Sequence, residues 1–121
     1  MPASITLYTY ANCSTCRSAV GWLRSKQINF AEKPIYTEPP TLPELCRMLA
    51  HQGGNLRRLF NTSGLQYRAQ GLSVRLPKIS TDDALALLAS DGRLIKRPFL
   101  LGETFGLVGF DPEEWAEELG T

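Results

Sequence analysis

The stretch that decides the fold is residues 4–26, with the sequence SITLYTYANCSTCRSAVGWLRSK. Its first part, Ser4–Tyr10, is rich in β-branched and aromatic residues and predicts a strand. Large side chains fall on both faces of that strand, which favours a strand covered on both sides in an α/β sheet. After the short loop Ala11-Asn12, apolar residues recur at helical spacing, and we expect a helix over Ser14–Lys26.

Working outward, the middle of the chain has mainly helical signals. A second strand is expected over Ile28–Ile35, which completes a strand–helix–strand unit. Thr41 and Glu44 have the spacing of a helix-capping box. Asn55 is placed to cap a further short helix. For Leu65–Lys78 we expect irregular chain with one short helical turn.

The last third of the chain predicts a helix, a hairpin and a final helix. Ser80-Thr81-Asp82-Asp83 opens a helix with acidic residues in its first turn. The apolar runs Pro98–Leu101 and Leu107–Phe110 flank a glycine-containing turn and predict a β-hairpin. Asp111-Pro112 predicts the start of the last helix, with aspartate as its N-cap.

This order of elements, β-α-β, a helical middle and then α-β-β-α, is typical of a thioredoxin-like fold. We therefore expect one α/β domain over residues 1–121, with a four-stranded mixed sheet flanked by helices. Its core comprises residues 1–38 and 78–121, and residues 39–77 form a helical insertion in the middle of the chain. A length of 121 residues suits one domain with one core.

The overall composition argues against several classes of function. The chain has 13 basic and 12 acidic residues, so its net charge of +1 gives no long-range attraction to nucleic acid or anionic membrane. No segment approaches the roughly 20 consecutive apolar residues of a membrane helix, and the N-terminus lacks a secretory signal pattern. Three cysteines are an odd count that fits a reducing compartment. We expect a cytoplasmic protein with no membrane and no direct nucleic-acid partner.

The motif that carries chemistry is Cys13-Ser14-Thr15-Cys16, at the point where the first strand gives way to the first helix. Unpaired backbone N–H groups and the helix dipole stabilise a thiolate at a helix N-terminus and lower its pKa. Cys13 is therefore the expected nucleophile. Cys16 lies one turn further on, where it is placed to resolve a mixed disulfide on Cys13. We expect Asn12, immediately before the motif, to contact the substrate.

A metal site is the main alternative for these cysteines. Cys13, Cys16, Cys46 and His51 are all residue types that bind zinc. Cys46 and His51 are five residues apart on an expected helix, however, so they point roughly 140° from each other. We therefore expect no metal site. In the structural interpretation, Cys46 is a half-buried side chain that only fills space in the packing. His51 then lies at the C-terminal end of its helix, where a positive charge is favourable.

Two arginines and a proline complete the expected site. Pro98 opens an apolar strand, where it removes no ladder hydrogen bond, and in a thioredoxin fold this proline is typically cis beside the reactive cysteine. Arg97 would then lie next to the thiolate or a bound oxyanion, the alternative being an exposed basic pair with Lys96. Arg17 either pairs with a carboxylate, attracts the thiolate or an anionic substrate, or is a solvated surface residue.

In this order and spacing the motifs resemble those of the ArsC/Spx family, a branch of the thioredoxin-like superfamily, and most of all its Spx-related, arsenate reductase-like members. The resemblance covers nearly the whole chain. It rests on Cys13–Arg17 with Ala19 and Trp22-Leu23, on Pro39-Pro40-Thr41, on Leu59–Gly64 with Tyr67, on Leu94–Pro98 and on Val108–Phe110.

The resemblance implies three candidate activities, of which arsenate reduction is the least favoured. Family arsenate reductases use one cysteine, which matches Cys13, and hold the oxyanion with three further arginines. Only Arg97 matches one of these, and the other two positions correspond to Asn61 and Gly109. The loss of two arginines removes much of the charge-assisted binding of a tetrahedral oxyanion.

The other two activities use both cysteines or a small thiol. Spx-like regulators use a Cys-x-x-Cys redox switch and bind the C-terminal domain of the RNA polymerase α subunit, which makes that subunit an alternative partner. A third group resembles glutathione-dependent thiol reductases, in which Asn61 and Arg97 would hold a glutathione carboxylate.

Our first hypothesis from the sequence is a thiol–disulfide oxidoreductase. Cys13 would be the nucleophile and Cys16 the resolving thiol. Arg97 would stabilise the thiolate or an anionic substrate, and Pro98 would shape the substrate groove. We expect no bound cofactor, and electrons from a small thiol such as glutathione or from a partner protein, thioredoxin or glutaredoxin.

Overall fold

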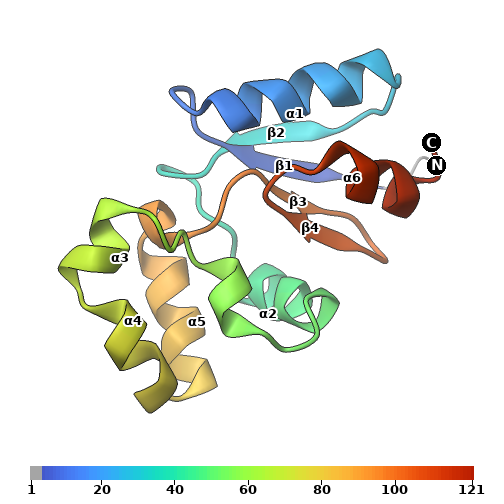
Figure 1. Cartoon of the computed structure of the whole chain (residues 1–121). Coiled ribbons are helices and arrows are strands. Elements are labelled where there is room, and N and C mark those ends of the chain that lie inside the picture. The colour runs from blue at the N-terminus through green and yellow to red at the C-terminus, as the bar shows by residue number, and fades with distance from the viewer. Residues whose placement is uncertain (1–3) are drawn as a thin grey trace.

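The computed structural model describes residues 4–121, which form a four-stranded mixed sheet in the order β2-β1-β3-β4 (Figure 1). The central strand β1 (Thr6–Thr9) runs parallel to β2 (Ala31–Pro34) and antiparallel to β3 (Phe99–Leu101). β3 in turn pairs antiparallel with β4 (Gly106–Val108), as expected of the hairpin. The thioredoxin-like α/β fold predicted from the sequence is confirmed.

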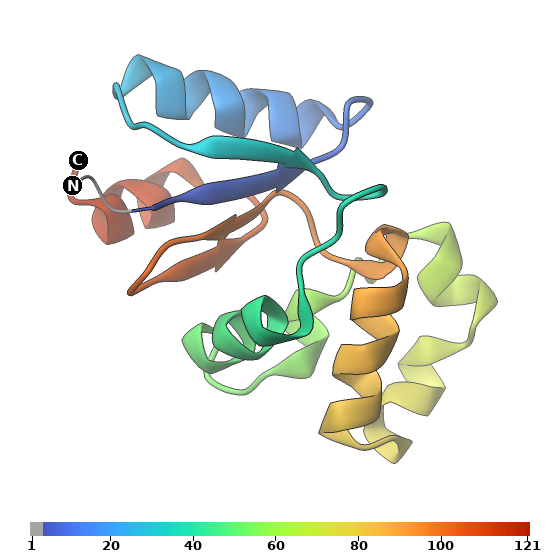
Figure 2. The same ribbon diagram turned by 180° about the vertical axis from the view of Figure 1, so that it is seen from behind.

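Helices cover both faces of this sheet. They are α1 (Ser14–Ser25), α2 (Leu42–His51), α3 (Leu65–Ala69), α4 (Leu72–Arg75), α5 (Thr81–Ser90) and α6 (Pro112–Leu119), with short 3-10 turns η1 (Leu56–Leu59), η2 (Leu76–Lys78) and η3 (Gly92–Leu94). α1 and α6 pack on one face, and α2 to α5 gather on the other (Figures 1 and 2). No helix within residues 4–121 is long and apolar enough to span a membrane.

The alternation of side chains along β1 divides the apolar core in two. Leu7 points into a cluster with residues of α1 and α6, including Trp115. Tyr8, its neighbour, points into the larger cluster made with α2 to α5. Both side chains are almost fully buried. The expectation of a strand covered on both faces is therefore confirmed, whereas the edge strand β2 has four exposed residues.

The capping box at the start of α2 is present and also ties the helix to the sheet. The Thr41 hydroxyl accepts from the Glu44 backbone N–H at 3.3 Å, and Glu44 Oε1 accepts from the Thr41 N–H at 2.9 Å. The buried Tyr8 hydroxyl donates to the same carboxylate oxygen at 2.8 Å. The N-caps Ser80 and Asp111 are likewise as predicted.

Three local expectations are wrong. Asn55 precedes η1 but makes no side-chain capping hydrogen bond. Leu65–Lys78 contains α3, α4 and η2 rather than one short turn, because Tyr67 and Leu72 are buried in the larger core and hold the chain in helical turns. Cys46 is exposed rather than half-buried, since α2 turns Leu45 and Met48 toward the core instead.

The expected division of the chain into a core and an insertion over residues 39–77 stays a prediction. α5 lies outside that range, yet it packs against α2 within the same helical layer (Figure 2). The β3–β4 hairpin is also held by this layer, because Arg47 of α2 donates to the Gly102 carbonyl at 2.6 Å. The helical layer and the sheet thus share one continuous packing arrangement.

Candidate functional site

The Cys13 side chain is the N-cap of α1. Its backbone is extended (φ −104°, ψ 110°), and its Sγ accepts a hydrogen bond from the backbone N–H of Cys16 at 3.2 Å. The Cys13 N–H donates to the Tyr10 carbonyl at 3.1 Å, which fixes the turn between β1 and the helix. In most helices a serine or aspartate oxygen occupies this capping position. Here the Cys13 sulfur takes that place.

The surroundings of Cys13 favour its thiolate. Burial is the largest single influence on the Cys13 pKa and acts to raise it. It is outweighed by hydrogen bonds from the thiol and backbone N–H of Cys16, together with hydrogen bonding and positive charge from Arg97, so the pKa is lowered. Thiolate is the reactive form of cysteine, and Cys13 is half-buried rather than sealed in the core.

Cys16 has the opposite character. Its side chain is buried, and burial is the main reason that its pKa is raised to about 12. The hydrogen bond it donates to Cys13, and the negative charge there, raise the pKa further. The site therefore pairs an ionisable outer thiol with a protonated inner thiol, and neither is in a disulfide.

Arg97 is held beside Cys13 by two stacked tyrosines. The Tyr10 and Tyr36 rings lie 4.1 Å apart and nearly parallel, and the guanidinium carbon of Arg97 is 5.1 Å and 5.6 Å from their centroids. The peptide bond between Arg97 and Pro98 is cis. Among residues 4–121, Nε and Nη1 of Arg97 are buried and find no hydrogen-bond partner. These two donors are available to an anionic group.

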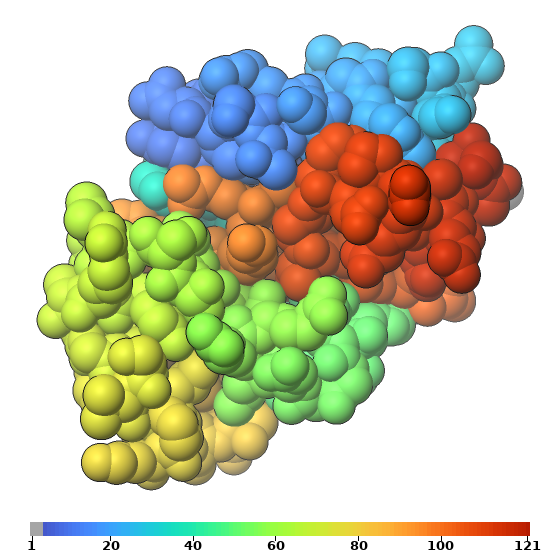
Figure 3. Space-filling model, in the orientation of Figure 1, coloured from blue at the N-terminus to red at the C-terminus, as the bar shows by residue number. Residues whose placement is uncertain are grey.

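A hollow of about 520 Å³ opens next to this guanidinium, and we call it the Arg97 hollow. It is lined by Arg97, Asn61, Tyr36, Ser63 and Gln66 among others. In Figure 3 the orange chain around residues 95–98 lies between the blue start of α1 and the green segment that follows α2. The sequence-predicted residues Asn61 and Arg97 are thus brought together.

A backbone contact between distant segments places Asn61. Phe60 pairs with Ile95 in an isolated β-bridge, and the Asn61 N–H donates to the Leu94 carbonyl at 2.7 Å. This pairing places Asn61 beside Leu94, three residues before Arg97. No local pattern in either segment reveals it.

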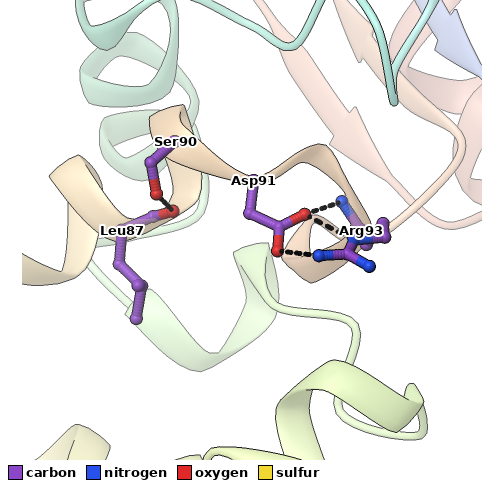
Figure 4. A network of polar contacts seen from close by, with 4 residues as sticks. All are labelled: Leu87, Ser90, Asp91 and Arg93. Carbon is purple, nitrogen blue, oxygen red and sulfur yellow. Dashed lines mark hydrogen bonds and ion pairs between the residues drawn. The ribbon is translucent and has the colours of Figure 1, made fainter.

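The second arginine at the rim of the Arg97 hollow is already engaged. Figure 4 shows Arg93 bound to Asp91 through both carboxylate oxygens, with Nε–Oδ1 and Nη2–Oδ2 distances of 3.0 Å. Asp91 also accepts from the Arg93 backbone N–H, which caps η3 after α5 has ended at Ser90. Arg97 is therefore the arginine of this hollow with two donors, Nε and Nη1, unpaired within residues 4–121.

Asn12 and Arg17 lie on the exposed side of the motif. Asn12 is exposed immediately before Cys13. Arg17 is also exposed, and its Nη1 donates to the Ala11 carbonyl at 2.8 Å. Arg17 therefore braces the loop in front of Cys13, a contact that is not among those considered from the sequence.

A second hollow, of about 350 Å³, lies on the α1 side of the motif, and we call it the Cys16 hollow. Cys16, Thr9 and Glu32 all contribute to its lining. The Thr9 hydroxyl donates to Glu32 Oε2 at 2.7 Å. Sequence reasoning missed Thr9, Glu32 and Tyr36. The one available signal was a polar threonine on a strand face expected to be buried.

Metal ligands do not gather in the described part of the chain. No group of three or more His, Cys, Asp or Glu side chains within residues 4–121 is arranged to hold a metal ion. Cys46 and His51 are both exposed on α2.

Comparison with known proteins identifies the family. The model of the ArsC family matches residues 8–118. The chain belongs to the ArsC family. Among curated relatives of this ArsC-family protein, the uncharacterised YusI of Bacillus subtilis is 40% identical, over 94% of this chain and 97% of YusI. The global transcriptional regulator Spx of Enterococcus faecalis is 31% identical, over 91% of this chain and 82% of Spx.

Solved structures agree with this membership. An ArsC family-related protein from Bacteroides fragilis has a TM-score of 0.89 and 38% identity, covering 94% of this chain and 96% of that one. A possible arsenate reductase from Streptococcus mutans has a TM-score of 0.83 and 41% identity, covering 89% and 92%. The family that the motifs resembled is therefore confirmed.

Proposed function

We propose that this ArsC-family protein is a thiol–disulfide oxidoreductase. The thiolate of Cys13 attacks one sulfur of a substrate disulfide, forming a mixed disulfide and releasing the other sulfur as a thiolate. Cys16 then attacks Sγ of Cys13 and displaces the second substrate thiol. Two electrons pass to the substrate, and the protein is left with a Cys13–Cys16 disulfide that an external thiol reduces.

One observation carries this proposal: the Cys16 backbone N–H, one turn into α1, donates to Sγ of Cys13 at 3.2 Å. The Cys16 thiol and N–H donate to Cys13 and so lower its pKa, while burial and the same contact raise that of Cys16. A nucleophile with a lowered pKa and a second thiol one turn away suit the two displacement steps.

The Arg97 hollow supports an anionic substrate group at this site. Within the described residues 4–121, two buried Arg97 donors lack a partner, and an unsatisfied buried donor on a charged group is costly. A carboxylate placed there would accept a charge-assisted hydrogen bond from one of these donors. We propose that Asn61 and Arg97 bind such a carboxylate, as in glutathione, with Pro98 shaping the groove and with Asn12 and Arg17 contacting the substrate on the exposed side of Cys13.

The reductant completes the proposal. The protein needs no bound cofactor for the two displacement steps, because an external thiol supplies the electrons. We propose glutathione, or thioredoxin or glutaredoxin as a protein partner, and a location in the reducing cytoplasm.

A turnover assay tests this function. Disulfide reduction is followed with glutathione or thioredoxin as the electron source, in a Cys46→Ser background because Cys46 is an exposed third thiol. Cys13→Ser is expected to abolish turnover. Cys16→Ser is expected to retain the first attack and accumulate a mixed disulfide that intact-mass measurement detects. Turnover that survives Cys13→Ser would overturn the proposal.

A redox-sensing regulator is the second candidate, and the similarity to named regulators favours it. Besides Spx, the regulatory protein MgsR of Bacillus subtilis is 27% identical over 94% of this chain. In this role the Cys13–Cys16 pair would switch affinity for the RNA polymerase α subunit. Pull-down with the C-terminal domain of that subunit tests the role, and capture in only one redox state would support it.

Arsenate reduction is the least supported alternative. Gly109 has a φ of +72°, and a Cβ added there would lie 3.3 Å from Cε of Lys96. An arginine is therefore poorly accommodated at this position. With Asn61 at the other position, Arg97 is left as the single match to the family's oxyanion-binding arginines. An arsenate reduction assay beside the disulfide assay distinguishes the two activities.

A further inference from the structure

The second displacement step of the proposed function needs a base. Cys16 must lose its proton before it can attack Sγ of Cys13, because thiolate is the attacking form. Once a substrate is attached to Cys13, the charge there is gone, but Cys16 remains buried in the same place. Burial is the largest of the influences that raise the Cys16 pKa.

The Cys16 hollow offers a route for that proton. Cys16 and Glu32 both line it, on opposite elements, α1 and the edge strand β2. Its volume of about 350 Å³ is enough for several water molecules at roughly 30 Å³ each. A proton released at Cys16 can therefore travel through water to the carboxylate.

Thr9 fixes the carboxylate at the wall of this hollow. Within residues 4–121, Thr9 is the polar residue that is buried, and its exposed fraction is 7%. Its hydroxyl donates to Glu32 Oε2 at 2.7 Å and so restricts a side chain that is otherwise on an exposed strand. Such a hydrogen bond holds Glu32 toward β1 rather than toward open solvent.

Glu32 is the carboxylate among the residues that line the Cys16 hollow. The other charged groups there are Arg17 and Arg24 of α1, which carry no acceptor for a proton. Tyr10, a phenol, also lines it. On the far side of the motif, Arg97 is likewise a cation.

We propose that Glu32 is the proton acceptor for Cys16 during resolution of the mixed disulfide, with Thr9 as the residue that positions it. The Cys16 proton passes through water in the hollow to Glu32. The Cys16 sulfur then forms a bond to Sγ of Cys13, the bond from Cys13 to the substrate breaks, and the substrate departs as a thiolate. Reduction of the Cys13–Cys16 disulfide returns the proton. This inference rests on the proposed oxidoreductase function.

Two phases of thiol release test it. Reduced protein with the Cys46→Ser change is mixed with the aromatic disulfide dithionitrobenzoate, whose coloured thiol is released once by Cys13 and once again by Cys16. Glu32→Gln is expected to leave the first phase unchanged and to slow the second at neutral pH by about a hundredfold, the lower end of general-base effects. The slow phase should recover as pH rises, because hydroxide then replaces the carboxylate.

Matched variants separate the possible results. Glu103→Gln, at an exposed carboxylate in the β3–β4 turn, should match the parent in both phases. Thr9→Val should slow the second phase less than Glu32→Gln does, because the carboxylate remains. If the parent releases only one equivalent, the proposed dithiol function fails. The function stands if the parent releases two equivalents of the coloured thiol. The proton-acceptor role is nevertheless wrong if Glu32→Gln then has the parent's second-phase rate, or if it slows both phases equally.

Discussion

The backbone N–H of Cys16 donates to Sγ of Cys13 at 3.2 Å, so the reactive sulfur is also the cap of its own helix. The sulfur accepts more strongly as a thiolate than as a thiol, because charge-assisted hydrogen bonds are the stronger ones. Ionisation of Cys13 and the stability of the first turn of α1 are therefore linked.

Variants at Cys13 should separate this capping role from reactivity. Cys13→Ser keeps a capping oxygen and should leave the free energy of unfolding nearly unchanged. Cys13→Ala removes the acceptor and should cost about 1 kcal/mol. Chemical denaturation of both variants measures the difference. Equal stability would contradict the capping role, whereas a stable Cys13→Ser shows that its loss of activity is chemical.

Substitution of Arg97 should weaken the Cys13 nucleophile. Arg97→Gln removes a positive charge and a hydrogen bond that lower the Cys13 pKa, so that pKa should rise. Alkylation of Cys13 near neutral pH should slow several-fold, and the rate should approach the parent value at high pH, where both proteins are ionised. The measurement is the alkylation rate against pH in the Cys46→Ser background.

Arg93→Gln is the matched control for that experiment, because Arg93 lines the same hollow but is bound to Asp91. Its alkylation profile should follow that of the parent. A profile for Arg97→Gln that also matches the parent would show that the guanidinium does not influence the thiolate.

The Glu44 carboxylate should make stability depend on pH. Burial acts to raise the Glu44 pKa, but it is outweighed by hydrogen bonds from the Thr41 N–H, the Tyr8 hydroxyl and the Thr41 hydroxyl, with the charge of Lys33 adding, so the pKa is lowered. A lowered pKa means that the carboxylate stabilises the fold above its unfolded pKa of about 4.3, and that this contribution is lost as pH falls through the folded pKa.

Glu44→Gln should therefore be less stable than the parent at pH 7, by about 1–2 kcal/mol. The difference should shrink as the pH falls below about 4, because the parent carboxyl then also becomes neutral. Denaturation curves over a pH series measure it. Tyr8→Phe, which removes one donor, should show a smaller effect of the same sign, and a pH-independent difference would contradict the linkage.

Two glycines should respond oppositely to alanine. A Cβ at Gly92 would overlap the Ile35 carbonyl oxygen and backbone, which cannot move without shifting the end of β2, so Gly92→Ala should cost at least about 3 kcal/mol. Gly21 lies within α1, and its added Cβ would meet no atom of another described segment within 4 Å. Gly21→Ala should stabilise the protein by about 0.5–1 kcal/mol. Thermal or chemical unfolding of both variants checks the prediction, and a neutral Gly92→Ala would refute the close approach.

The parts of the fold that could be predicted are those with local causes. Thr41, Ser80 and Asp111 cap helices through contacts that reach only two or three residues along the chain. A window of sequence contains both partners of such a contact. The prediction failed for Leu65–Lys78, whose helical turns depend on burial against distant parts of the core.

The candidate site divides in the same way. The N-cap position of Cys13 and the depth of Cys16 follow from the two cysteines at the start of one helix. Tyr36 and Glu32 were missed because their partners, Arg97 and Thr9, are respectively 61 and 23 positions away along the chain. Separations this long follow no helix or strand period, so neither contact can be recognised from the sequence.

The sequence by itself determined the order of strands and helices, the position of the thiol pair at a helix N-terminus and the family to which the chain belongs, since each rests on neighbouring residues or on motif order. The tertiary structure alone decided that Arg97 stacks on Tyr10 and Tyr36 with two donors unpaired in the described part of the chain, and that Glu32 shares a hollow with Cys16. The physical reason is that charge and burial act through space, over a few ångströms, between segments that only sheet pairing and core packing bring together.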